Sequence, residues 1–151
     1  MTIEYLIQYT SMAVAILFLI IKRAGMKKYV PVAMFSSLYA NLWCYIAKYY
    51  NFWSFPSRIF PIVEDISITV NLIVVPIIAM FWVRYYPTGF KKEILWYFMW
   101  SSGLIAIEFL IEKYTNLLSY SNGFKWYYSY FLWFISFYIW RQFHLWLYRH
   151  Y

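Results

Sequence analysis

The chain has 151 residues, of which 64% are hydrophobic and only 13% are charged. A water-soluble domain usually carries about 25% charged residues, and a disordered chain is poor in apolar residues, so both of these classes are excluded. The single cysteine excludes an internal disulfide and a metal site built from several cysteines. The composition therefore indicates an integral membrane protein. Its apolar runs are continuous rather than alternating, which favours α-helices over a β-barrel.

Five apolar segments follow one another along the chain, each about long enough to cross a bilayer core of roughly 30 Å as a helix. The predicted membrane spans cover residues 3–21, 29–50, 62–83, 94–111 and 126–146. The fold class that we predict is all-α, a polytopic membrane protein with five transmembrane helices in a single bundle over residues 1–151. We expect the first segment to be retained, because it lacks the basic start and the small-residue cleavage site of a signal peptide.

Basic residues predict the orientation of these spans, since short cytoplasmic loops are rich in lysine and arginine. Nine of the 13 lie in the loops after the first and third spans or at the C-terminal end: Lys22, Arg23, Lys27, Lys28, Arg84, Lys91, Lys92, Arg141 and Arg149. The other four are Lys48, Arg58, Lys113 and Lys125. The bias predicts an N-terminus outside and a C-terminus in the cytoplasm. The net charge of +7 then matches anionic lipid headgroups, so the bilayer is the expected partner and nucleic acid is not.

Polar side chains recur at helical spacing within the second, third and fourth spans. These stripes are Ser37, Asn41, Cys44 and Lys48; then Glu64, Ser67 and Asn71; then Ser101, Glu108 and Glu112. Polar groups within a membrane span usually face the interior of the bundle, because exposure to lipid is costly. We therefore expect the three stripes to face one another.

The predicted topology brings Glu64, Asp65, Glu108 and Glu112 to the outer half of the bundle, close to Lys48. Two interpretations remain open. In the structural one, Lys48 pairs with Glu108 or Glu64 and the ion pair locks the helices together. In the functional one, the acids form an outward-facing pocket that binds or moves a proton or a hard cation, since acids within a membrane are costly unless they are paired or used.

In the functional interpretation Glu108 is the binding or gating carboxylate, because it lies deepest. The remaining residues of the predicted pocket are the accessory acids Glu112, Glu64 and Asp65, the neutral ligands Asn41 and Asn71, and Lys48, Ser67 and Ser37. Oxygen ligands of this kind suit Mg²⁺, Ca²⁺, Mn²⁺ or Na⁺ rather than Zn²⁺. No cofactor is predicted. The apolar segment 51–61, which carries two prolines, is interpreted either as a lid over the pocket or as a plain interfacial loop.

Enzyme motifs are not found in the sequence: there is no nucleophile elbow, no glycine-rich phosphate loop and no HExxH pair. Catalysis is therefore the least supported class of function. The alternative to ion binding is an accessory or structural subunit, whose aromatic face docks another membrane protein or a second copy of the chain.

Three stretches carry a resemblance to a known family: YVPVAMFSSLYANLWCYIAKYY, FPSRIFPIVEDISITVNLIVVPIIAMFWVRYYP and NGFKWYYSYFLWF. The chain resembles, over most of its length, a family of small, functionally uncharacterised five-helix membrane proteins from endospore-forming Bacillus and Clostridium relatives. The resemblance implies a bacterial plasma-membrane protein and implies no activity. The five spans and the nine tryptophans also look like the tryptophan-rich sensory protein group, but the Trp-rich, Pro-Pro loop of that group is missing. That likeness is architectural and does not extend to porphyrin or sterol binding.

Overall fold

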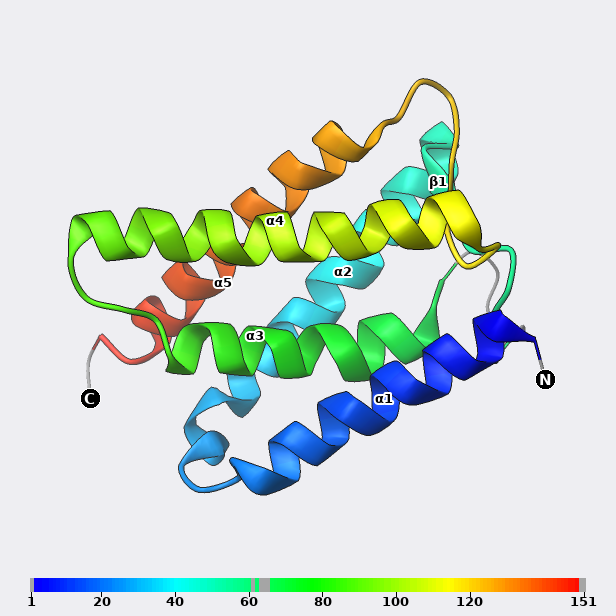
Figure 1. Ribbon diagram of the computed structural model, residues 1–151. Coiled ribbons are helices and arrows are strands. Elements are labelled where there is room, and N and C mark those ends of the chain that lie inside the picture. The colour runs from blue at the N-terminus through cyan, green and yellow to red at the C-terminus, as the bar shows by residue number, and fades with distance from the viewer. Residues whose placement is uncertain (1, 61, 63–65, 150–151) are drawn as a thin grey trace.

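The computed structural model describes residues 2–60, 62 and 66–149, and over these residues the predicted all-α class is confirmed. The elements are α1 (Ile3–Ile21), η1 (Met26–Tyr29), α2 (Val30–Tyr50), β1 (Trp53–Ser54), η2 (Val70–Val74), α3 (Val75–Arg84), α4 (Phe90–Tyr114), β2 (Ser119–Tyr120) and α5 (Trp126–Leu147). In the view of Figure 1, α1, α3 and α4 lie in front, α2 and α5 lie behind them, and the termini lie at opposite ends.

Two short strands, which the sequence did not predict, close one end of the bundle. β1 pairs antiparallel with β2, with Trp53 opposite Tyr120 and Ser54 opposite Ser119. The two connecting segments cross this end without helical hydrogen bonds, so their backbone groups pair with each other instead. We call it the ladder end, and the opposite end, where η1 and the α3–α4 connection lie, the basic end.

The third helical segment is shorter than the predicted span 62–83, because the helix formed by η2 and α3 runs only from Val70 to Arg84. Ile66 and Ser67 are not helical. Pro76 has no N–H to donate to the carbonyl of Leu72, and the preceding turn widens, so that the N–H of Val75 donates to the carbonyl of Val70, five residues earlier. A helix of this length spans roughly 22 Å. As far as the described residues go, it leaves part of the ladder end without a third helix.

Aromatic packing fills the half of the bundle near the basic end. The Trp82 ring is fully buried and stacks on Phe137, with ring centroids 4.8 Å apart. Tyr97 of α4 meets the edge of Trp82 at 5.1 Å, and the Trp96 indole donates to the Trp82 carbonyl at 3.3 Å. These contacts hold α3, α4 and α5 together at this half.

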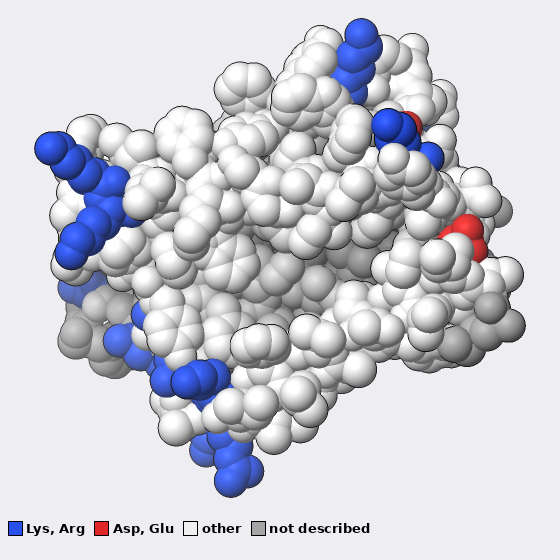
Figure 2. All heavy atoms as spheres, in the orientation of Figure 1, with Lys and Arg blue, Asp and Glu red and all other residues white. Residues whose placement is uncertain are grey.

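The outer surface is unsuited to water. Three helices, Ile3–Ile21, Met26–Tyr50 and Phe90–Tyr114, are long and apolar enough to cross a membrane, and large apolar side chains such as Leu17 and Phe131 are exposed on the bundle. Figure 2 shows lysine and arginine gathered at the two ends, with an uncharged band between them on this face. Apolar patches of this size mark contact with lipid or with protein, so membrane association is supported.

Candidate functional site

A cavity of about 320 Å³ lies toward the ladder end and is lined by residues from all five helices. It lies where the third helix falls short, so that Ser67 and Asn71 form one wall and Glu108 of α4 belongs to another. The rest of the lining is mainly apolar, with four tryptophans, two tyrosines and several aliphatic side chains. The space is of the size and character of a small-molecule site.

Residues 51–60, the described part of the predicted lid segment, form part of the wall of this cavity. Trp53, Phe55 and Ser57 line the space, and Gln8 of α1 holds the segment in place. The buried Gln8 amide donates to the Ser57 carbonyl at 3.2 Å and accepts from the Ile59 N–H at 3.4 Å. This arrangement fits the interpretation of the segment as a cover over the pocket.

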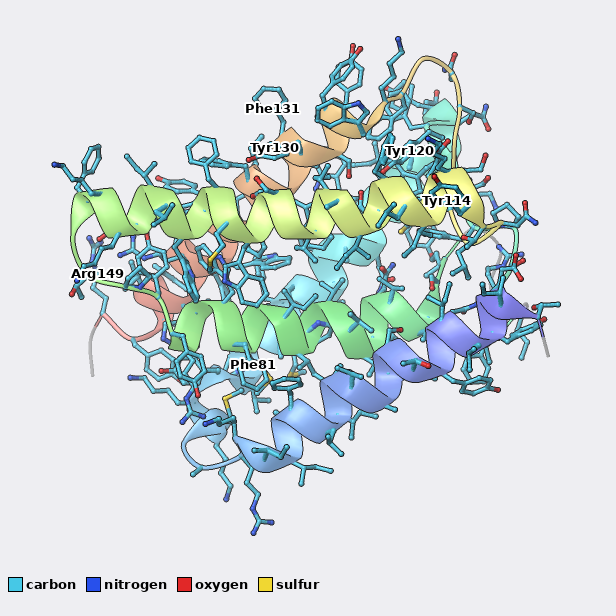
Figure 3. All side chains as sticks on the ribbon, viewed as in Figure 1. Phe81, Tyr114, Tyr120, Tyr130, Phe131 and Arg149 are labelled. Atoms are coloured by element: carbon cyan, nitrogen blue, oxygen red, sulfur yellow. The ribbon has the colours of Figure 1, made fainter. Side chains whose placement is uncertain are left out.

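Glu108 is the acid of the cavity wall. Its Oε2 accepts hydrogen bonds from the Tyr120 hydroxyl at 2.9 Å and from the Ser129 hydroxyl at 2.5 Å, while its Oε1 accepts from the Trp133 indole at 2.5 Å. Ser129 and Trp133 lie one turn apart on α5, and Figure 3 shows Tyr120 beside the last turns of α4. Three donors from two other elements therefore fix the direction of this carboxyl group.

Tyr120 lies on β2, outside the helices, and its hydroxyl stays protonated in the hydrogen bond with Glu108. Burial raises the pKa of its hydroxyl, and the nearby Glu108 carboxylate raises this pKa further. A phenol with a raised pKa stays neutral and can donate. The hydrogen bond therefore runs from Tyr120 to Glu108 across the ordinary pH range.

A second polar group joins α2 to the third helix. The Ser37 hydroxyl donates to the Asn71 carbonyl at 2.7 Å, and the Asn71 amide donates to Asn41 Oδ1 at 3.0 Å and to the Cys44 sulfur at 3.2 Å. Ser37, Asn41 and Cys44 are three of the four residues of the predicted polar stripe of α2, and these three contact Asn71. Asn71 lies in the widened turn of η2, where it takes part in these hydrogen bonds and also lines the cavity.

The structure brings only some of the predicted pocket residues together. Glu108, Asn71 and Ser67 line the cavity, Ser37 and Asn41 lie behind Asn71, Glu112 is half-buried one turn beyond Glu108, and Lys48 is exposed near the end of α2. Glu64 and Asp65 lie outside the described residues. Within the described residues the donors to Glu108 are neutral, and no three histidine, cysteine or acidic side chains are close enough to hold a metal ion.

Four residues of the site are not among the predicted pocket residues. Tyr120, Ser129 and Trp133 bind Glu108 from distant parts of the chain, which helical spacing within one span does not reveal. Gln8 had a signal, since it is the one amide in the first apolar segment. An amide within such a segment is expected to find a partner.

The geometry thus describes a mainly apolar space with a firmly oriented carboxyl group on its wall. Other polar groups, among them Asn71 and Gln8, also line the space. In comparisons with protein-family models, with curated proteins and with solved structures, nothing matches the chain.

Proposed function

We propose that this chain is an integral membrane protein that binds a small, largely apolar molecule in the cavity, with Glu108 as its polar anchor. The observation that carries the proposal is a partly open space of about 320 Å³ with mainly apolar walls and a few fixed polar groups. Such a combination is typical of small-molecule sites. A hard cation would require several oxygen ligands, and among the described residues Glu108 is the one acid that lines the space.

A lateral approach from the membrane supports this proposal. Ile107 of α4 lines the cavity although its side chain is 55% exposed. Figure 2 shows the face of the bundle hollowed between α4 and the helices α3 and α1. A molecule dissolved in the apolar layer can therefore reach the space without first passing through water.

The test of the proposal is to fill the space. We expect Ala40→Phe, which adds a ring to a cavity-lining position of α2, to reduce binding of the probe tert-butylbenzene on the order of tenfold or more, because the added volume occupies the site. Binding would be measured by saturation-transfer NMR titration of the purified full-length protein in a nonionic detergent.

The matched control is Ala106→Phe on α4, at an exposed position that is not part of the lining. It undergoes the same substitution and should bind the probe as the unmodified protein does. Equal binding by all three proteins, or saturable binding by none, would contradict the proposal.

We propose further that all five helices cross the bacterial plasma membrane, with the N-terminus and the ladder end outside. The charge bias of the loops supports this orientation. In a Cys44→Ser background, we expect Asn122→Cys to react with a membrane-impermeant maleimide in intact cells, because it follows β2, and Thr88→Cys to react only after the cells are permeabilised. If Thr88→Cys alone were labelled in intact cells, the orientation would be the opposite of the proposed one. If both variants were labelled there, the proposal of five membrane spans would be rejected.

Two predictions from the sequence stay open beside this proposal. One is the resemblance to the family of membrane proteins from endospore formers. The other is docking to another membrane protein or to a second copy, for which the exposed aromatic side chains of α5, such as Phe131 in Figure 3, give a surface.

A further inference from the structure

The charges around the cavity are unbalanced. Among its described lining residues there is an acid, Glu108, and there is no lysine, arginine or histidine. The three donors to Glu108 are a phenol, an alcohol and an indole, none of which carries a positive charge. In its ionised form the carboxylate is thus oriented by the chain but not neutralised by it, and a bound molecule can supply the positive charge.

Aromatic rings surround the same space. Trp43 and Tyr39 of α2, Trp53 of β1, and Trp133 and Trp140 of α5 all line the cavity. The faces of such rings attract cations, most strongly where water is excluded. A carboxylate together with several aromatic rings is the combination that binds an ammonium group, whereas a neutral apolar molecule gains nothing from the charge.

The position of Glu108 indicates where the charged part and the apolar part of the bound molecule would lie. Glu108 lies six residues before the end of α4, which is about 9 Å along the axis from Tyr114 and from the ladder end. The cavity continues past it toward Val75, Ile78 and Leu104, which are apolar. A cationic group at Glu108 would therefore lie near the ladder end, with an apolar body reaching into the bundle.

We propose that the molecule bound in this cavity is an amphiphilic organic cation, whose ammonium group pairs with Glu108 among the aromatic rings. This inference rests on the proposed function, since it requires that the cavity binds a small molecule. It adds the chemical class of that molecule.

The experiment uses two probes of nearly equal shape, phenyltrimethylammonium and its neutral carbon isostere tert-butylbenzene. Both are titrated by saturation-transfer NMR against the full-length protein in a nonionic detergent, with partition into empty micelles measured separately. We expect Glu108→Gln to weaken binding of the cation on the order of tenfold or more relative to the isostere, because the charge partner is removed while the shape is kept. Glu112→Gln is the matched control, since Glu112 is an acid of the same helix that does not line the cavity. This variant should prefer the cation over the isostere to the same degree as the unmodified protein.

The outcomes separate this inference from the proposed function. If tert-butylbenzene saturates the site and phenyltrimethylammonium does not, or if Glu108→Gln leaves the preference between the probes unchanged, the inference is overturned and the proposed function stands. If neither probe binds saturably, both fail. Should Glu108→Gln not fold, the partition-corrected preference of the unmodified protein decides, because a site without charge recognition would favour the isostere.

Discussion

Replacement of Trp82 by alanine is expected to lower the free energy of unfolding by about 3–5 kcal/mol, the usual cost of removing a fully buried large aromatic side chain. Trp82 has no exposed surface, stacks on Phe137 and meets Tyr97. Its loss leaves a hole at the point where α3, α4 and α5 meet, and the rings around it cannot all move inward at once. Unfolding would be followed by circular dichroism during titration with a denaturing detergent.

Trp146→Ala is the control for this prediction. Trp146 of α5 is 66% exposed, so its replacement removes few contacts within the bundle and should change the free energy of unfolding by less than about 1 kcal/mol. Equal effects of the two replacements would show that the aromatic core does not stabilise the bundle as described.

The helices could be predicted from the sequence where hydropathy and helix length agree. α1 has the bounds that the apolar run predicts, and α2 and α5 differ from the prediction by one residue at one end. The third segment could not be predicted in this way. Its described part is helical only after Ser67, since Ile66 and Ser67 are not helical, and an average of hydropathy does not register where the helix begins.

The candidate site could be predicted only where one helix presents its own stripe. Asn41 and Asn71 were expected to face each other, and their amides form a hydrogen bond. Lys48 was a partner of Glu108 or Glu64 in one of the two interpretations, whereas the described hydrogen-bond donors to Glu108 come from α5 and β2. Pairings between such distant segments depend on how the helices cross and on the loop that closes the ladder end, and these features are not encoded in local spacing.

The volume of the cavity could not be predicted from the sequence either. It results from a short third helix, from a cover held by Gln8 and from the absence of bulky side chains at Ala40, Ser67 and Ser136. Each residue by itself is ordinary for a membrane bundle. Only their arrangement in space produces a cavity beside Glu108.

The modification rate of Cys44 tests most directly whether a small molecule occupies this space. Cys44 is the one cysteine of the chain, and it is buried in the cavity lining, so an intact-mass measurement of N-ethylmaleimide addition reports on this site without any substitution. With tert-butylbenzene at ten times its dissociation constant, the occupied fraction should slow the reaction by roughly tenfold. In denaturant, where the cavity does not exist, the probe should have no effect.

The account predicts strong protection of Cys44 in the folded protein, with a dependence on probe concentration that follows the binding curve. A rate of Cys44 modification that stays the same when the probe is fully bound would place the probe outside the cavity and contradict the account.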